Sequence, residues 1–297
     1  MNFLACPLLF CAAPLAAQVG AWKIGGSGLA WSGSDSINAL VEMGTDIRPV
    51  YFRPQRNAYE HFSGWKPLRE PRQLDFVYGE VPRSWKGARG NETTAHNGTY
   101  LVDGDSTTFN PPVSSEPETV WYTLDTGVPI PAFRFGFFTP PRGYRSDGTP
   151  FVQDAVPAFE VSISAEGEAE WLEKTSYQQV GTVIASVPEN FSANVQIEFP
   201  RQYVRFVRYK RLTSLLDGAA GNTNSTSSGQ AFAGTIADFE LFAEGVPRRA
   251  VYRSRIFDLG QAFNLGRLHW AATPMRMVDG ELVDVDSAAV KVVVVVR

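Results

Sequence analysis

The sequence predicts an all-β protein built on an antiparallel β-sandwich or barrel. Between residues 90 and 245, short runs rich in β-branched and aromatic residues recur, each bounded by turn-forming residues. Nowhere do apolar residues keep the spacing of a long amphipathic α-helix. The 20 prolines and 26 glycines among 297 residues suit many brief strands joined by turns.

The expected strands can be read directly from these runs. In chain order they are VWYTLDTG, AFRFGFF, AFEVSISAEG, NVQIEFP, QYVRFVRY and TIADFELFAEG. Before the last run stands the small-residue stretch LLDGAAGNTNSTSSGQAFAG, whose composition predicts a surface loop. In RFVRYKR the alternation of side chains along a strand puts the basic residues on both faces of the sheet, so we expect no phosphate-binding stripe.

The N-terminal part falls into two predicted segments. Residues 1–17 are apolar and end in small residues, the pattern of a secretory signal peptide that is too short to span a bilayer. Both cysteines, Cys6 and Cys11, lie there, so the mature chain would have no disulfide or thiol chemistry. Residues 18–88 have short aromatic-rich runs and many turns, which predicts a β-rich region of unassigned type. We therefore expect a secreted, periplasmic or cell-envelope protein.

A partial repeat predicts a second module at the C-terminal end. The aspartate-x-glycine of Asp125 recurs at Asp258, which is 133 residues later (258 minus 125), and an arginine follows nine residues after each, at Arg134 and Arg267. A period of that length is about one domain. Residues 247–297 are thus the expected, incomplete start of a second sandwich, ending in the predicted strand KVVVVVR.

Five segments, taken together, resemble the discoidin or coagulation factor 5/8 type C domain family. They are DGDSTT, WYTLDTG, FEVSISAEGEAEW, RQYVRF and ELFAEG, in the order and spacing usual for that family. The chain departs from the family pattern at Asn110, Thr126 and Gln202, where Trp, Leu and Arg are usual. The resemblance implies a galactose-binding-like jelly roll over residues 89–246. Bacterial members of the family include carbohydrate-binding modules.

The DGDSTT loop is a candidate calcium site. Calcium prefers six to eight hard oxygen ligands on a chain that bends tightly, and Asp103, Asp105 and Thr108 offer such oxygens within one loop. The resemblance adds Glu240, which opens the last strand. The alternative is an Asx-type turn that is held by its own hydrogen bonds and has no metal.

A second loop, Thr139 to Phe151, is the candidate ligand-binding loop. Jelly-roll modules bind mainly with the loops at one end of the sandwich, where aromatic rings meet sugar rings and polar side chains meet hydroxyl groups. This loop groups Arg142, Tyr144, Arg145 and Asp147. The alternative is an ordinary connection with exposed charges.

The sequence contains no known catalytic motif, so we expect no enzyme activity in this chain. His61, His96 and His269 are scattered, and the acidic run EGEAEWLEK is typical of a solvated hairpin. The formal net charge of -4 gives no overall attraction to nucleic acid.

The predicted function is a non-catalytic module that binds carbohydrate or another cell-surface polymer, with no membrane span. The alternative is a structural spacer in a larger envelope protein, without a ligand of its own. An enzymatic domain outside these 297 residues is compatible with either.

Overall fold

The computed structural model confirms the all-β class, because every strand pairing it describes is antiparallel. Two short 3-10 helices accompany the strands, η1 (Ala58–His61) and η4 (Phe151–Gln153). The residues that the structure describes are 37–39, 41–43, 46–61, 77–79, 101–102, 104–109, 121–145, 148–165, 181–214, 234–253, 267, 269–279, 281–287 and 291–294.

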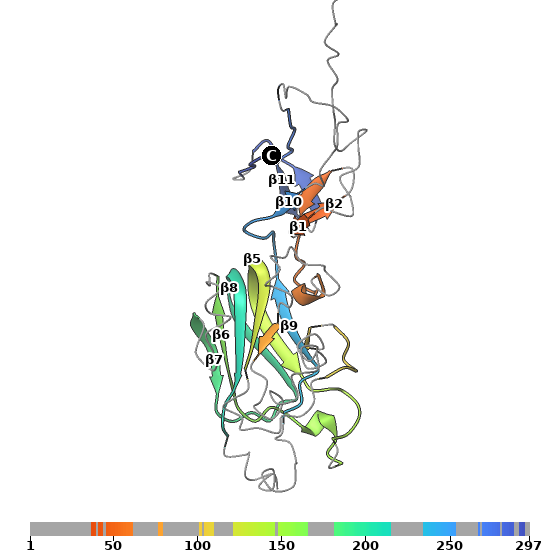
Figure 1. Ribbon diagram of the computed structural model, residues 1–297, viewed down its shortest axis with the longest axis vertical. Helices are drawn as coiled ribbons and strands as arrows, with labels where there is room; N and C mark the ends of the chain where they lie inside the picture. Colours follow the sequence, from red (N-terminus) through yellow and green to blue (C-terminus); the bar gives the residue numbers. More distant parts are fainter. Residues whose placement is uncertain are drawn as a thin grey trace, which may run out of the picture.

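One six-stranded sheet forms the body of the protein (Figure 1). The order of its strands is β4-β5-β8-β6-β7, and β9 also pairs with β5. The strands are β4 (Val77–Gly79), β5 (Trp121–Phe138), β6 (Phe159–Ser164), β7 (Thr182–Val187), β8 (Asn194–Arg211) and β9 (Asp238–Ala243).

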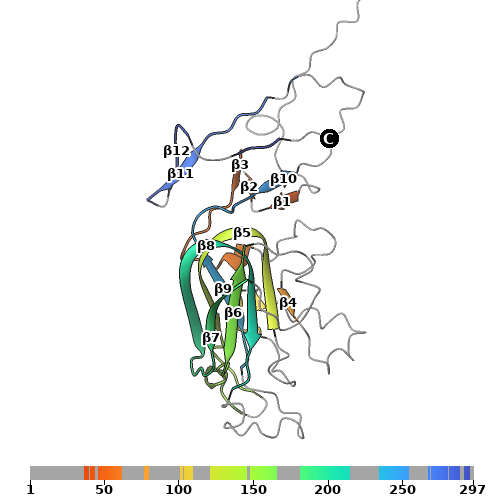
Figure 2. The ribbon, with the colours of Figure 1, turned by 90° about the vertical axis from the view of Figure 1, so that its left-hand side faces the viewer.

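The long pair β5 and β8 bends the sheet over itself (Figure 2). Between Asp125 and Ile130 the register shifts, so that residues 126–129 of β5 stand opposite Arg205 alone. Before this bulge β5 pairs with β4, and after it β5 pairs with β9. Since a bulge bends and twists the strand that carries it, the sheet becomes two layers that share the strands β5 and β8.

The two layers meet through a cluster of aromatic side chains. Tyr122 and Tyr209 belong to the layer with β4 and β6, whereas Phe137 and Phe239 belong to the layer with β9. The ring centroid of Tyr209 lies 5.3 Å from that of Phe137 and 5.4 Å from that of Phe239. Edge-on and tilted pairs of this kind stabilise a core by about 0.5–1.5 kcal/mol each beyond the area they bury. The alternation along β9 supplies Phe239, since every second residue of a strand faces the core.

The basic residues late in β8 are buried. Arg208 is 1% exposed, and its guanidinium lies 4.6 Å from the ring centroid of Trp121. Burial lowers the pKa of Arg208 to about 10, which leaves it cationic at neutral pH. Lys210 is also buried, and its Nζ forms an ion pair with Oε1 of Glu160 at 2.6 Å. The angles at this Glu160 oxygen do not meet those of a hydrogen bond. Arg208 and Lys210 therefore lie inside the protein and do not form a basic surface.

The sandwich also draws on residues before position 89, so its boundary differs from the predicted one. Strand β4 joins the sheet at residues 77–79, and Val50, Phe52 and Tyr59 pack in the same core cluster as β5 and β9. Asn57 fixes this segment against β9: its Oδ1 accepts a hydrogen bond from the Leu241 amide at 3.0 Å. Its Nδ2 donates to the Phe239 carbonyl at 3.3 Å. The segment thereby covers the free edge of β9, which would otherwise expose unpaired backbone groups.

Short strand pairs flank the sandwich at one end in both views (Figures 1 and 2). They are β1 (Ile37–Ala39) with β10 (Val251–Arg253), β2 (Val41–Met43) with β3 (Ile47–Pro49), and β11 (Met275–Val278) with β12 (Glu281–Asp284).

The C-terminal residues do not form the second sandwich that we expected, as far as the structure describes them. Strand β10, at the start of the expected module, pairs instead with β1. Residues 291–294, which we expected in a strand, have none assigned, and Val293 is 67% exposed. The predicted signal peptide, residues 1–17, lies outside the described residues. Where the chain is described, it has no helix with the length and hydropathy needed to cross a membrane.

We predict that the Asn57→Ala variant loses about 2–4 kcal/mol of unfolding free energy, because it leaves buried backbone groups of β9 without a partner. Urea denaturation measures this loss. The matched control is Gln202→Ala, an exposed amide on β8, which should change stability by less than about 0.5 kcal/mol. Equal effects of the two substitutions would contradict the edge-covering role of Asn57.

Candidate functional site

The candidate loop, residues 139–151, belongs to the connection between β5 and β6. The Arg145 amide donates to the Thr149 carbonyl at 2.8 Å, and the Phe151 amide donates to the Gly143 carbonyl at 3.1 Å. The φ angle of Gly143 is 98°, a conformation that favours glycine. These paired backbone groups make the described residues 143–145 and 148–151 two antiparallel arms.

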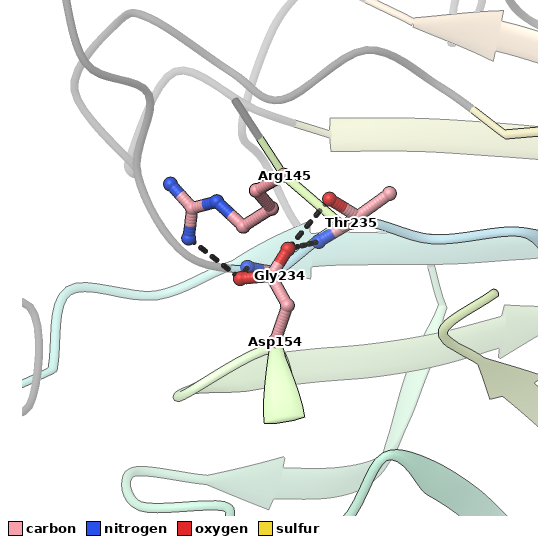
Figure 3. A network of polar contacts seen from close by, with 4 residues as sticks. All are labelled: Arg145, Asp154, Gly234 and Thr235. Carbon is pink, nitrogen blue, oxygen red and sulfur yellow. Dashed lines mark hydrogen bonds and ion pairs between the residues drawn. The ribbon is translucent and has the colours of Figure 1, made fainter. Parts of the chain in front are cut away.

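A buried carboxylate anchors the base of this loop (Figure 3). Oδ1 of Asp154 accepts hydrogen bonds from Arg145 Nη1 at 2.7 Å and from the Gly234 amide at 3.0 Å. Oδ2 accepts from the amide of Thr235 at 3.0 Å and from its hydroxyl at 2.6 Å. The side chains of Arg145 and Asp154 are only 5% and 0% exposed. Four donors thus compensate the desolvation of the carboxylate.

Arg145, which we expected to face a ligand, instead holds the loop to the segment before β9. Its guanidinium is buried against Asp154, so it acts on the site by positioning its neighbours. The partner segment is itself constrained at Gly234, whose φ is 108°. A Cβ at that position would lie 3.0 Å from the Cα of Val156. The backbone can therefore approach Asp154 only with glycine there.

Tyr144 and Arg142 are the predicted ligand residues that the loop exposes. Tyr144 is 70% exposed, and Arg142 is exposed beside it along the chain. Asp147, the fourth predicted residue, lies outside the described residues. Tyr144 thus offers an aromatic face to solvent beside the Arg142 guanidinium.

A second exposed aromatic, which the sequence analysis missed, lies at the same end of the sandwich. Phe191, in the turn between β7 and β8, is 76% exposed. Asn190 links this turn to the connection between β5 and β6. Its backbone amide donates to the Pro157 carbonyl at 2.6 Å, and its side-chain Nδ2 donates to the Val156 carbonyl at 2.8 Å. The sequence feature that could have indicated Phe191 is its place among the turn-forming residues of PENFS, outside any predicted strand.

Asp105, in the acidic loop before β5, forms an Asx-type turn with Thr107. The amide and the hydroxyl of Thr107 donate to Asp105 Oδ1 at 2.9 and 2.7 Å. The amide and the hydroxyl of Thr108 donate to the Asp105 carbonyl at 3.1 and 2.9 Å. The hydrogen bonds from the Thr107 hydroxyl and then from its amide lower the pKa of the Asp105 carboxyl below its ordinary value.

This acidic loop packs against the candidate loop. The ring centroids of Phe109 and Phe151 are 4.7 Å apart, and Phe151 is buried at the end of the candidate loop. A Cβ at Gly143 would lie 3.1 Å from the same Phe151 ring. The two loops that we singled out separately therefore form one packed unit at one end of the sandwich.

The described residues do not by themselves form the predicted calcium site. Asp103 lies outside them. Glu240 lies on β9, where its Oε2 accepts a hydrogen bond from Gln196 Nε2 at 3.1 Å. Within the described ranges no three His, Cys, Asp or Glu side chains gather as metal ligands would. Asp105 and Thr108 share one turn, as described above, so calcium binding stays a prediction.

The residues considered for catalysis are only partly described. His269 is exposed. His96 and the acidic run around Glu168 lie outside the described residues. The candidate end of the sandwich is thus defined by exposed aromatic side chains on braced loops.

We predict that Arg145→Ala lowers the unfolding free energy by about 3–5 kcal/mol, since it leaves the Asp154 carboxylate buried without its cation. The matched control is Arg201→Ala, which breaks the ion pair of Arg201 with Glu244; these side chains are 57% and 43% exposed. That loss should stay below about 1 kcal/mol. Chemical denaturation of both variants tests the difference, and similar losses would refute the anchoring role of the buried pair.

The chain matches no protein-family model and no curated protein. Among solved structures, it is similar to a chitosan-binding module of a chitosanase/glucanase from Paenibacillus sp. IK-5, in complex with chitotriose. The two chains are 18% identical with a TM-score of 0.33, and the match covers 51% of this chain and 90% of that one. A family 32 module of Clostridium perfringens in complex with galactose matches at 10% identity and a TM-score of 0.33, covering 48% and 82%. Another Clostridium perfringens module, in complex with GlcNAc-α-1,4-galactose, matches at 13% identity and a TM-score of 0.34, covering 56% and 88%.

Proposed function

We propose that this chain is a non-catalytic binding module of a secreted or cell-surface protein, and that it binds carbohydrate or another surface polymer through the loop end of its sandwich. The observation that carries the proposal is Tyr144. Its ring is 70% exposed at the tip of a loop, and the base of that loop is locked by the buried Asp154 carboxylate. A loop backbone that is held in place before the ligand arrives loses little conformational entropy on binding.

The chemistry of this end suits a sugar. The faces of pyranose rings carry C–H groups that pack on aromatic rings, and Phe191 offers a second such ring from a loop tied to the first. Arg142 adds exposed guanidinium donors, which fit hydroxyl oxygens. Such a set of a few exposed groups gives a shallow site of modest affinity.

If the chain were a structural spacer, we would expect the N-terminal region to cover the end of the sandwich that has the candidate loop. In the described part of the chain, residues 50–59 pack along β9 instead. The flanking strand pairs lie at the end of the sandwich opposite to the candidate loop (Figures 1 and 2). This arrangement favours the binding proposal, because it leaves Tyr144 and Phe191 in solvent.

A glycan array, followed by calorimetric titration of each hit, tests the proposal. We expect Tyr144→Ala and Phe191→Ala each to weaken binding about tenfold, which is about 1.4 kcal/mol. The matched control is Tyr203→Ala: Tyr203 is a 41% exposed aromatic on β8, paired in register with Pro131 beside the bulge. It should bind like the unaltered chain. Failure to bind any glycan or matrix polymer would overturn the proposal and leave the spacer role.

Calcium at the acidic loop is a separate proposal, which rests on Asp103 and Asp105. If the ion binds only the folded chain, chelator lowers the melting midpoint and added calcium restores it. In Asp105→Ala the midpoint should no longer respond to chelator. Elemental analysis gives the second readout. An unchanged melt together with absence of bound calcium would leave only the hydrogen-bonded turn.

A further inference from the structure

Exposed arginine side chains gather at the end of the sandwich that lies beside the bulge of β5. The Glu244 amide donates to the Pro131 carbonyl of β5 at 3.0 Å, which places Glu244 next to that bulge. Its carboxylate Oε2 accepts a hydrogen bond from Nη1 of Arg201 at 2.9 Å. The side chains of Arg201 and Glu244 are 57% and 43% exposed, so their ion pair lies on the surface of the protein.

Two further arginines lie beside this ion pair, on the turn formed by residues 53–56. Two antiparallel backbone bridges hold the turn, namely Phe52 with Gly245 and Asn57 with Phe242. Between the bridges, the four residues of the turn stand opposite residues 243–244, so the turn lies beside Glu244. Arg53 and Arg56 are its two ends: the Arg56 amide donates to the Arg53 carbonyl at 3.1 Å, and both residues are exposed.

Arg248 and Arg249 extend this surface on the other side of Gly245. The Arg248 amide donates to the carbonyl of Pro129 in the bulge at 3.0 Å, and both arginines are exposed. The arginine patch is thus made of Arg53, Arg56, Arg201, Arg248 and Arg249. In the described part of the chain, no carboxylate forms an ion pair with Arg53, Arg56 or Arg249.

The arginine patch is positive on a chain that is negative overall. Its five arginines and Glu244 sum to +4, whereas the formal net charge of the chain is -4, so all other residues together carry -8 (-4 minus +4). This separation of charge repels an anion from most of the protein and directs it to the patch. Planar guanidinium groups bind carboxylates through two parallel hydrogen bonds. One carboxylate, that of Glu244, already lies among these arginines.

We propose that the arginine patch is a second binding site, for an acidic polysaccharide whose uronic acid carboxylates pair with the arginines. A polymer with repeated anions suits cations that come from three separate segments of the chain. A sugar chain holds its carboxylates at a nearly fixed spacing, so it loses less conformational entropy on binding than an acidic polypeptide does. The patch lies at the end opposite Tyr144 and Phe191. It therefore goes beyond the loop-end proposal and does not depend on it.

Other polyanions fit this end of the sandwich less well. The flanking strand pairs lie beyond it (Figures 1 and 2), so a flat lipid bilayer would meet them before it reached the patch. A single-stranded nucleic acid needs aromatic rings on which its bases stack. Phe52 and Phe242, at the two bridges, are only 1% and 8% exposed. That leaves Tyr203 on β8, 41% exposed, as one ring near Arg201.

Calorimetric titration of the full chain with polygalacturonate tests the proposal. The matched probe is the same polymer after methyl esterification, which removes the charge and keeps the sugar chain. We expect saturable binding of the charged polymer alone, weakened at least about tenfold by high salt, because salt screens exposed charges. Binding should persist in the double variant Tyr144→Ala, Phe191→Ala, even if no glycan binds at the loop end. Its loss in that variant would assign the binding to the loop end and overturn this proposal.

Two pairs of substitutions complete the test. The double variant Arg53→Gln, Arg56→Gln should bind polygalacturonate at least about tenfold more weakly, because it removes charge-assisted hydrogen bonds. The matched control is Arg276→Gln, Lys291→Gln, which removes the same charge from exposed residues elsewhere and should leave the affinity unchanged. If the first variant melts early, Arg249→Gln replaces it, with the same expected direction.

Three results would contradict the proposal. They are the absence of saturable binding of polygalacturonate, equal affinities of the patch variant and its control, and tighter binding of single-stranded DNA or poly-L-glutamate at the same salt concentration.

Discussion

The bulge in β5 is the constraint on which the rest of the fold depends. Four residues of β5 stand opposite one residue of β8 there, and the sheet changes its outer strand from β4 to β9 across this point. Thr126 is buried inside the bulge, and its hydroxyl lies 2.7 Å from the Val128 carbonyl and 3.2 Å from the Arg205 carbonyl. The Thr126 hydroxyl is thus within hydrogen-bond distance of backbone carbonyls at the bulge, where the register shift interrupts the pairing of β5 with β8. This explains why a threonine suits the position where the discoidin family usually has leucine.

The bend gives the sandwich two unlike ends. At the bent end, Glu244 and Arg248 donate backbone hydrogen bonds to carbonyls of β5 near the bulge, and the flanking strand pairs lie beyond (Figure 1). At the other end, the loops after β5 and β7 are joined to each other by Asn190. The backbone contacts of the flanking segment and the exposed aromatic residues of the loops therefore lie at opposite ends of the sandwich.

Much of the fold could be predicted because it depends on local alternation. In FEVSIS every second residue faces the core, so the inward side of β6 follows from the pattern alone. In AFRFGFF a register shift between Ala132 and Arg134 interrupts the alternation, so the core residues there are Ala132, Phe135 and Phe137. The packing of residues 50–59 could not be predicted in this way. Asn57 contacts residues more than 180 positions away in the chain, and a single asparagine among turn formers does not indicate such a partner. The expected second module rested on a short echo of residues, too little to specify which strand β10 would pair with.

The candidate site divides in the same way. The loop after β5 and its aromatic Tyr144 were evident in the sequence, since a long run of turn formers with one exposed ring has a local signature. The roles within the loop depend on burial: Arg142 and Arg145 are alike in sequence, yet one is exposed and the other is paired with Asp154 inside the protein. Composition and alternation thus established the all-β class, the residues of β5, β6, β8 and β9, and the loop. They did not indicate β7, nor that two predicted runs join into one long strand in each of β5 and β8. Tertiary packing alone decided which arginine is structural, because burial arises only when distant segments meet.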